Sequence, residues 1–370
     1  IVLSGYIPED ICPAFYGAKL FALSKKDGGV RPIAVGCTLR RTAAKICMYK
    51  ISESCKTTFL PNQLGVGCPS GAEVAIHTCR RFWNNEQGSG KIILKIDFSN
   101  AFNTLHRDHV LKIVKHSNPS LYPMAYQAYK SNSNLYFGSE VILSQLGLQQ
   151  GDPAGPYYFS LGIQDLIKSL ESELNLWYLD DGCIGVTVDT VFEDFQKIIN
   201  EGAKMGLKLN FSKCEIISLG QENEDFKPIL RKFEQIATEI KKTDTYDFKL
   251  LGSPITMEAS DKVLDEKLSD LQRMCDKLLN IDCHDALYLL KNCLALPKLL
   301  FFLRSAPLYN CKKLEDFDNT LKSCLEKVLN IQLNDTKWRQ ASLPVRLGGL
   351  GIRSMVQIST SAFISSCYKS

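Results

Sequence analysis

The stretch Trp177-Tyr178-Leu179-Asp180-Asp181-Gly182 sets two adjacent carboxylates between two runs of strand-favouring residues. The apolar and aromatic run 174–179 predicts an incoming β-strand, residues 180–182 a turn, and residues 183–188 the returning strand of a hairpin. Adjacent acids at a hairpin tip repel each other, and this repulsion raises their pKa values. A bound divalent cation removes that cost, so the stretch predicts a metal site.

A third acid, Asp97, directly follows the apolar run 91–96, which predicts another strand. Three carboxylates on two strands of one sheet are the arrangement that two-metal phosphoryl transfer requires. Two ions about 4 Å apart would lower the pKa of an attacking 3′-hydroxyl and stabilise a leaving pyrophosphate. We expect Asp97 and Asp180 to be direct metal ligands, with Asp181 partly in a supporting position. The alternative is a set of ordinary turn and cap acids.

Composition indicates a globular chain with room for several packed parts. The 370 residues are 45% hydrophobic and 23% charged, which suits two or three subdomains and excludes a disordered chain. The net charge of +4 is a weak basic bias. It neither indicates nor excludes a nucleic-acid partner, because a local basic groove can exist inside a nearly neutral chain.

The fourteen cysteines are scattered, without a Cys-x-x-Cys pair, and none of the five histidines completes a zinc-ligand spacing. We interpret them as free thiols in a reducing intracellular compartment. The longest apolar run, 293–303, contains Pro297 and Lys298 and does not predict a membrane span. No signal peptide is visible, and the chain begins at Ile1 without a methionine, so we expect a fragment of something longer.

Two further segments offer groups to a ligand beside the acids. In the segment 147–156, glycines allow close backbone approach, and Gln149 and Gln150 offer donors and acceptors to a base or sugar. The alternative for this segment is an ordinary Gly/Pro turn ahead of a helix. Its position between Asp97 and the acidic hairpin favours the functional interpretation.

The second segment is the basic turn 25–33. Lys25 or Lys26 would hold a triphosphate as a point charge, and Arg31 would hold it as a planar fork. Taken alone, this turn would be interpreted as a solvated basic loop. The metal-binding acids elsewhere in the chain favour the phosphate-binding role.

Three other features have a structural and a functional interpretation. Phe102 is either a core aromatic or a ring beneath an incoming sugar that clashes with a 2′-hydroxyl. Lys213 is either a loop lysine or a general acid near the pyrophosphate. The strand 248–252 is either a sheet edge or a backbone grip on a primer end.

Hydrophobic periodicity predicts the remaining elements. We expect strands at 20–23, 30–35 and 214–218, a hairpin at 134–147, and helices at 38–49, 72–83, 107–114, 156–170 and 191–205. From residue 256 onward the chain reads as mostly helical, with helices at 259–280, 284–303 and 314–331. The first of these should bury a Leu/Met face and turn Lys262, Arg273 or Lys277 toward a nucleic-acid duplex.

Together and in this order, the motifs resemble those of a reverse transcriptase over about residues 17–255. The matching segments are 94–102, 149–156, 178–181 and 206–214 in the palm and 31–33 in the fingers. The segments 65–81, 149–152 and 338–352 resemble the non-LTR retrotransposon type. Leu179 and Ala154 depart from commoner residues of the family, but neither departure removes a ligand.

The resemblance implies an α+β right-hand polymerase fold, with fingers, a ferredoxin-like palm with an antiparallel sheet, and a helical thumb. The expected fingers span 1–90 with an N-terminal extension, and the palm spans 91–255 with part of the fingers inserted around 107–147. The thumb spans 256–332. A truncated C-terminal connection segment spans 333–370.

The resemblance also implies the chemistry and the partners. Two Mg²⁺ ions, with Mn²⁺ as a substitute, would be held at Asp97, Phe98, Asp180 and Asp181. The partners would be an RNA template, a DNA primer and dNTPs, without a membrane, in the nucleus. The implied site residues are Lys25, Lys26, Arg31, Phe98, Phe102, Gln150 and Gly151 for substrate binding, and Asp97, Asp180, Asp181 and Lys213 for catalysis.

Two other functions stay open at this point. An RNA-dependent RNA polymerase has a similar palm, although the bulk of Phe102 should exclude ribonucleotides. A catalytically silent nucleic-acid-binding remnant of such an element is the other, although every acid of the predicted metal site is intact.

Overall fold

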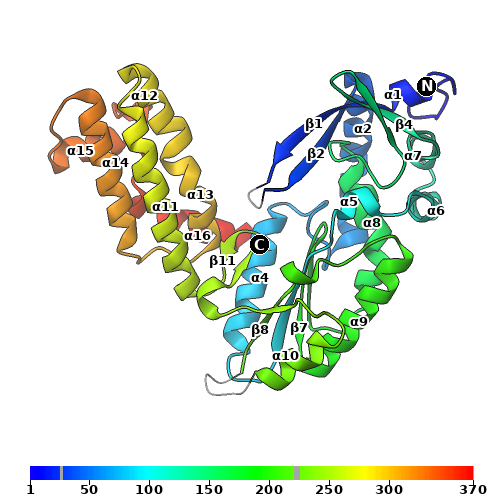
Figure 1. Ribbon diagram of the computed structural model, residues 1–370. Coiled ribbons are helices and arrows are strands. Elements are labelled where there is room, and N and C mark those ends of the chain that lie inside the picture. The colour runs from blue at the N-terminus through cyan, green and yellow to red at the C-terminus, as the bar shows by residue number, and fades with distance from the viewer. Residues whose placement is uncertain (26–27, 221–225, 370) are drawn as a thin grey trace. The chain divides into compact units, whose positions relative to one another are not determined.

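The computed structural model describes residues 1–25, 28–220 and 226–369, which form two compact units (Figure 1). One unit, here called the sheet unit, comprises residues 1–71 and 86–242. The other, the helical unit, comprises residues 72–85 and 243–370. Lys26 lies outside the described residues, so its predicted phosphate-binding role is left without a structural test.

The centre of the sheet unit is a five-stranded sheet in the order β6-β7-β3-β8-β9. Its strands are β3 (Ile92–Ile96), β6 (Leu174–Tyr178), β7 (Asp181–Val186), β8 (Glu215–Ser218) and β9 (Lys241–Lys242). β3 pairs antiparallel with both β7 and β8, and β6 and β7 form the predicted hairpin. The expected strand before Asp97 is therefore confirmed.

The hairpin turn differs from the expected one. Tyr178 pairs with Asp181, so Leu179 and Asp180 form a two-residue turn and Asp181 already belongs to β7. Leu179 has φ +57°, in the left-handed region that tight hairpin turns use. The prediction that residues 180–182 form the turn was wrong because a leucine gives no sequence signal for positive φ.

Two helices lie beside this sheet (Figure 1), and their apolar side chains supply much of its core. α8 (Gly155–Lys168) and α9 (Val188–Lys204) contact each other, and α9 contacts β3 and β7. Alternate β3 residues Ile92, Leu94 and Ile96 belong to this core, as the period of a strand requires. The sheet thereby holds the segment after β3 against a rigid support.

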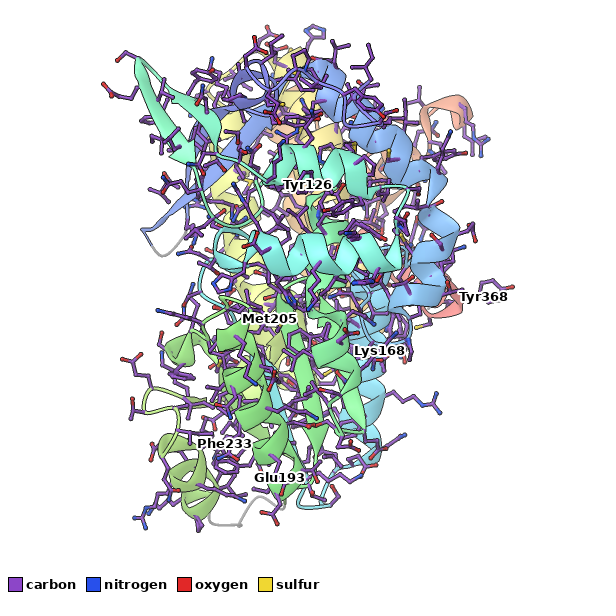
Figure 2. The ribbon with its side chains drawn as sticks, turned by 90° about the vertical axis from the view of Figure 1, so that its right-hand side faces the viewer. Tyr126, Lys168, Glu193, Met205, Phe233 and Tyr368 are labelled. Carbon is purple, nitrogen blue, oxygen red and sulfur yellow. The ribbon has the colours of Figure 1, made fainter. Side chains whose placement is uncertain are left out.

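Helix α10 (Lys227–Glu234) extends the same core with one aromatic side chain. The centroid of the Phe233 ring lies 5.3 Å from that of Phe192 and 5.9 Å from that of Phe195, both on α9. Figure 2 labels Phe233. Phe233 and Phe195 are fully buried. Helix α10 is thus tied to the rest of the sheet unit by aromatic packing.

A second sheet of the sheet unit has the order β2-β1-β4-β5. β1 and β2 form the expected antiparallel hairpin, β4 and β5 form another, and β1 runs parallel to β4. The strands are β1 (Ala18–Ser24), β2 (Val30–Gly36), β4 (Ser133–Phe137) and β5 (Glu140–Ser144). The other α-helices described in the sheet unit are α1 (Cys12–Phe15), α2 (Thr38–Lys50), α3 (Ser52–Phe59), α5 (Ala101–Thr104), α6 (Arg107–Ser117) and α7 (Tyr122–Tyr129).

The helical unit is built around α11 (Met257–Leu278). Thr256 caps this helix by accepting a hydrogen bond from the Ala259 N–H. The expected apolar face is buried at Val263, Leu264 and Leu271, whereas Leu279 lies past the helix end and is exposed. The other elements are α4 (Gly71–Asn85), β10 (Lys249–Leu250), β11 (Ser253–Pro254), α12 (Cys283–Leu289), α13 (Leu296–Ser305), α14 (Lys313–Leu329), α15 (Asp335–Ser342) and α16 (Met355–Lys369).

The predicted helix 284–303 consists of α12, a π-helical turn (Leu290–Leu294) and α13. Pro297 lies in the first turn of α13, where its missing N–H is tolerated. By length and composition, Cys283–Ser305 is apolar enough to cross a membrane, with a mean hydropathy of 1.5 and 28% of its most apolar 18 residues buried. A core helix of a soluble protein can have the same length and composition, so the absence of a membrane stays a prediction.

Residues 72–85, most of helix α4, belong to the helical unit. Arg304 on α13 donates two hydrogen bonds to Glu73, at 2.6 and 2.7 Å. Arg80 donates to the carbonyl oxygens of Pro254, at 2.6 Å, and Ile255, at 3.1 Å. Residues 72–85 are therefore joined to the helical unit, although they fall inside the fingers range predicted from sequence. The boundaries of fingers, palm and thumb stay a prediction.

The α+β class is confirmed by the central sheet, antiparallel from β6 to β8 with β9 parallel at its edge, by its helices and by the separate helical unit.

Candidate active site

Three acids meet at one end of the central sheet. Asp97 directly follows β3, Asp180 lies in the β6–β7 turn, and Asp181 begins β7. Because β3 and β7 are antiparallel, with Ile96 opposite Gly182, the three carboxylates come to the same end of the sheet. Asp97 and Asp180 line an open cavity of about 390 Å³. The other charged and polar lining residues are Lys25, Arg31, Ser99, Asn100, Gln150, Asn210 and Lys213.

Burial is the main cause of the raised pKa values of these three acids. Burial raises the pKa of Asp97, although Lys213, Lys25 and Lys95 act in the opposite direction. Burial and the Asp97 charge raise the pKa of Asp180.

Burial, followed by the charges of Asp180 and Asp97, raises the pKa of Asp181 to about 6, although Asp181 keeps exposed surface and does not line the cavity. Mutual repulsion of this kind is relieved by a divalent cation.

The segment that carries Lys213 is attached to the backbone around Asp97. The Asn210 N–H donates to the Asp97 carbonyl at 2.8 Å, and the Ser99 N–H donates to the Lys208 carbonyl at 2.7 Å. Lys213 ends the short 3₁₀ helix (Phe211–Lys213) that follows. Asn210 lies inside the fourth palm motif but was not singled out in the sequence, because an asparagine before a turn is usually structural.

The predicted phosphate-binding cations come from the β1–β2 hairpin. Lys25 lies just after β1, and its N–H donates to the Gly29 carbonyl at 2.7 Å. Arg31, the second residue of β2, has an exposed side chain. Both residues line the cavity that contains Asp97 and Asp180. The structure therefore places two of the three predicted cations opposite the acids.

Gln150 and Gly151 lie against β2. The Ala34 N–H donates to the Gln150 carbonyl at 2.7 Å, and the Gln150 side chain lines the cavity. Gly151 has φ +124°, and a Cβ atom there would lie 2.4 Å from the Ala34 carbonyl oxygen. This glycine is therefore required by the neighbouring strand, whereas the sequence attributed it to a ligand.

Gln149 does not face the cavity. It is buried, and its side-chain oxygen accepts a hydrogen bond from Arg40 at 2.8 Å. Its side-chain nitrogen donates to the Tyr16 carbonyl at 3.1 Å and to Ser133 Oγ at 2.9 Å. The expectation that both glutamines serve a base or sugar was wrong for Gln149, because the fold uses its polar groups.

A buried network next to Gln149 was missed in the sequence. Asp152 accepts hydrogen bonds from Arg40 at 2.7 Å, from the Tyr129 hydroxyl at 2.7 Å, and from the Ala154 N–H at 3.0 Å. The side chains of Arg40 and Asp152 are only 6% and 5% exposed. The network ties α2 and α7 to the loop that carries Gln150. Arg40 and Asp152 lie 112 residues apart, so no local signal revealed their ion pair.

The two predicted aromatic site residues differ in position. Phe98 is buried, lines the cavity, and stacks on Trp177 with 6.2 Å between ring centroids. Phe102 is half-buried and stacks on Phe159 with 4.5 Å between ring centroids. Its role as a sugar gate stays a prediction, because one face of the ring belongs to the core.

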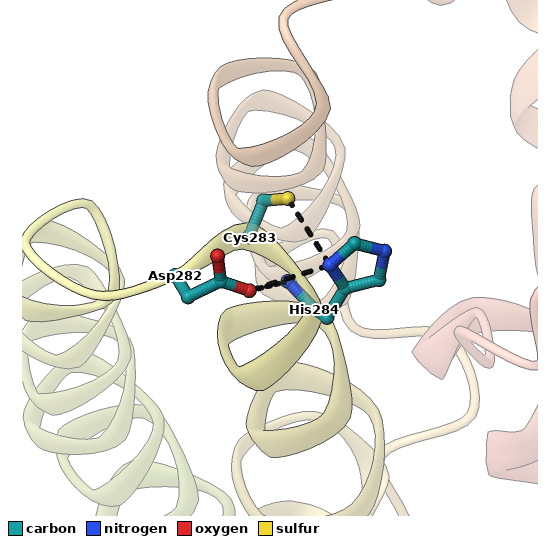
Figure 3. Close-up of side chains that lie close together, drawn as sticks. All are labelled: Asp282, Cys283 and His284. Atoms are coloured by element: carbon teal, nitrogen blue, oxygen red, sulfur yellow. Dashed lines mark hydrogen bonds and ion pairs between the residues drawn. The ribbon is translucent and has the colours of Figure 1, made fainter.

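A different trio of potential metal ligands, Asp282, Cys283 and His284, begins α12 (Figure 3). All three are exposed, and Asp282 caps the helix by accepting a hydrogen bond from the His284 N–H at 2.9 Å. Helix capping explains the arrangement without an ion.

One family model matches more than half of the chain. The family model described as reverse transcriptase (RNA-dependent DNA polymerase) matches residues 23–255, more than half of the chain and every cavity-lining residue named above. The retrotransposable element SLACS 132 kDa protein of Trypanosoma brucei gambiense is 22% identical over 97% of this chain. The chain spans 30% of the length of that relative.

Two solved structures are similar at lower levels. The apo telomerase of Candida tropicalis is 12% identical, with 96% of this chain and 66% of that chain covered and a TM-score of 0.46. The RNA-dependent RNA polymerase of a human picobirnavirus is 13% identical, with 54% and 42% covered and a TM-score of 0.39.

Proposed function

The chain belongs to the reverse transcriptase (RNA-dependent DNA polymerase) family, whose model it matches over residues 23–255, and from that membership we propose that it extends a DNA primer with dNTPs on an RNA template by two-metal phosphoryl transfer. The expected reverse transcriptase of the non-LTR retrotransposon type is confirmed. The chain is thus an RNA-directed DNA polymerase domain with a right-hand polymerase fold, and nucleic acid is its partner.

The crowded acids carry the proposal of a two-metal site. Carboxylate oxygens are the ligands that Mg²⁺ and Mn²⁺ prefer. Three carboxylate groups meet here, and burial raises the pKa of each. Asp97 and Asp180 would hold the ions, with Asp181 supporting them and Phe98 beside them. When bound, Mg²⁺ ions supply charge neutralisation and a more acidic 3′-hydroxyl.

The cavity-lining cations suit the triphosphate. Arg31 would bind phosphate oxygens as a fork and Lys25 as a point charge, since both line the cavity with the acids. Lys213, whose charge acts on Asp97, would give a proton to the leaving pyrophosphate. These residues act by positioning and by charge, as phosphoryl transfer requires.

The remaining roles concern recognition. Gln150 and Gly151 would line the minor groove of the template–primer duplex, and Phe102 would exclude a 2′-hydroxyl. We propose that the protein acts in a reducing intracellular compartment, the nucleus, and that it has no membrane partner. All fourteen cysteines are free thiols, which supports the reducing environment.

Primer extension on an RNA template with dNTPs and Mg²⁺, run beside Asp180→Asn, tests the proposal. We expect wild type to extend and Asp180→Asn to lose at least about 10³-fold in rate, because one metal ligand is gone. Binding of the primer–template should change by less than about threefold, since the loss concerns chemistry rather than ground-state binding.

Asp165→Asn is the matched control, because Asp165 is an exposed acid on α8. It should extend like wild type. Retained extension by Asp180→Asn would refute the metal-site assignment. Binding without extension by wild type would make the silent remnant the better description.

A further inference from the structure

Gln63 holds both backbone polar groups of a single residue in the β6–β7 turn. Its side-chain oxygen accepts a hydrogen bond from the Leu179 N–H at 2.8 Å, and its side-chain nitrogen donates to the Leu179 carbonyl at 3.1 Å. The oxygen also accepts from the Gly65 N–H at 3.0 Å. Gln63 is fully buried, with 0% of its surface exposed. A neutral side-chain amide therefore pairs with the turn as a strand backbone would.

The amide has only one orientation that satisfies these contacts. Two N–H groups point at one end of the Gln63 side chain, so that end must be the oxygen. The opposite end faces a carbonyl and must be the nitrogen. Glutamine alone combines this length, this donor and this acceptor, because glutamate lacks the donor and asparagine is one methylene shorter.

Leu179 is a residue that needs such support. Its φ of +57° puts a non-glycine residue in the left-handed region. This conformation costs about 1–2 kcal/mol relative to ordinary backbone angles. The next residue is Asp180, and the pair Tyr178–Asp181 encloses the turn. Any relaxation of Leu179 toward ordinary backbone angles would therefore move Asp180 and Asp181.

The backbone around Gln63 holds the incoming strand as well. The Trp177 N–H donates to the Asn62 carbonyl at 2.8 Å, and the Leu64 N–H donates to the Trp177 carbonyl at 2.7 Å. A Cβ atom on Gly65 would lie 2.8 Å from the Leu179 nitrogen. Residues 62–65 thus form a short extra edge along β6 that ends at the acidic turn.

We propose that Gln63 is a positioning residue that holds Leu179 in its left-handed conformation and so presets the Asp180–Asp181 turn for divalent cations. This role rests on the proposed two-metal function. Residues that orient metal ligands through hydrogen bonds change metal affinity or activity by about 10- to 100-fold when they are removed. Gln63 acts here through the backbone of Leu179, the residue directly before Asp180, and not through the carboxylates themselves.

The test compares Gln63→Met with Gln164→Met. Methionine keeps the length of glutamine and removes both hydrogen-bonding groups. Gln164 is the matched control, because it is also buried, at 3% exposure, and its side-chain amide donates to the Thr58 carbonyl at 3.2 Å rather than to the hairpin turn. Two quantities are measured: amide hydrogen exchange of the peptide 174–184 without metal, and the Kd for Mn²⁺ from electron paramagnetic resonance.

We expect Gln63→Met to speed exchange across 174–184 at least about tenfold and to weaken Mn²⁺ binding by about 10- to 100-fold. Raising the Mn²⁺ concentration should restore part of its primer extension. Gln164→Met should leave both quantities at the wild-type values, even where its melting temperature falls.

The proposal is overturned if Gln63→Met matches wild type in exchange and in Mn²⁺ affinity. If Gln63→Met does not fold, Gln63→Glu is measured at pH 8, where it keeps the acceptor and loses the donor, with the same expected directions. If wild type neither binds Mn²⁺ nor extends a primer, the two-metal function fails, and metal-free exchange still decides whether Gln63 holds the turn.

Discussion

Asp152 and Asp180 are acids of the same unit with opposite surroundings. Asp152 accepts hydrogen bonds from Arg40, the Tyr129 hydroxyl and the Ala154 N–H, all inside the fold. Asp180 faces a cavity, and burial and the charge of Asp97 raise its pKa. One carboxylate has its partners within the protein, whereas the other is held in a position that favours an added cation.

This difference separates scaffold from site more reliably than residue type does. Removing a charge from a satisfied buried network leaves its partner unpaired, which destabilises the fold. Removing a charge from a crowded group relieves repulsion, so stability is kept while function is lost. Substitutions can therefore tell whether a residue supports the fold or acts in the site.

The largest effect on stability is expected for Asp152→Asn. It should lower the free energy of unfolding by about 3–5 kcal/mol, because the buried Arg40 loses its counter-charge. Asp180→Asn should leave that free energy unchanged or raise it by up to about 1 kcal/mol. Equilibrium urea unfolding in EDTA, followed by circular dichroism, measures both.

A surface pair provides the control for this comparison. Lys232 pairs with Asp189, whose side chain is 84% exposed, so Asp189→Asn should change the free energy of unfolding by less than about 1 kcal/mol. Equal losses for Asp152→Asn and Asp180→Asn would break the division between satisfied and crowded acids.

Local patterns predicted the site more completely than they predicted its support. The strand before Asp97 and the hairpin around Asp180 are visible in the sequence because alternation and turn residues are short-range signals. Gln63 and Leu179 lie 116 residues apart, and Arg40 and Asp152 lie 112 apart. A single sequence contains no signal that joins polar residues at such separations.

Neighbouring residues show the same limit. Gln149 and Gln150 look equivalent in the sequence, yet the first is absorbed by the Arg40 network and the second lines the cavity. Which one faces the cavity is decided by how the loop meets β2, where Ala34 binds the Gln150 carbonyl. That contact belongs to tertiary packing rather than to local preference.

Phe102 has features of both a fold-supporting residue and a site residue. One face of its ring stacks on Phe159, yet the residue follows Asp97 by five positions. If the ring selects the sugar, Phe102→Ala should raise rNTP incorporation relative to dNTP by about 10- to 100-fold, equal to about 1.4–2.7 kcal/mol of discrimination. Single-nucleotide extension with each substrate measures the ratio.

Phe192→Ala is the control, since Phe192 is also half-buried and packs edge-on to Phe233, away from the cavity. It should lose stability without a change in the rNTP ratio. Free use of rNTPs by wild type would refute the gate and assign Phe102 to the core alone.

The smallest effect concerns a satisfied acid in the helical unit. A hydrogen bond from Arg304, assisted by Ser366, lowers the pKa of Glu73 below its ordinary value of 4.5. A depressed carboxyl pKa stabilises the fold above the unfolded pKa, and this stability is lost as pH falls through the folded value. Glu73→Gln should therefore lose about 1–2 kcal/mol at pH 7 and progressively less below about pH 4.5.

Melting temperatures of wild type and Glu73→Gln between pH 3.5 and pH 7 test this prediction. Glu53→Gln is the control, because the Glu53 side chain is 82% exposed in its pair with Lys56. The difference in melting temperature between metal-free wild type and Asp180→Asn should change with pH in the opposite direction. The raised pKa of Asp180 means that its ionised form destabilises the fold at high pH, and this destabilisation is lost as pH falls through that pKa. A gap between wild type and Glu73→Gln that stays constant with pH would show that shape, rather than charge, makes Glu73 a scaffold residue.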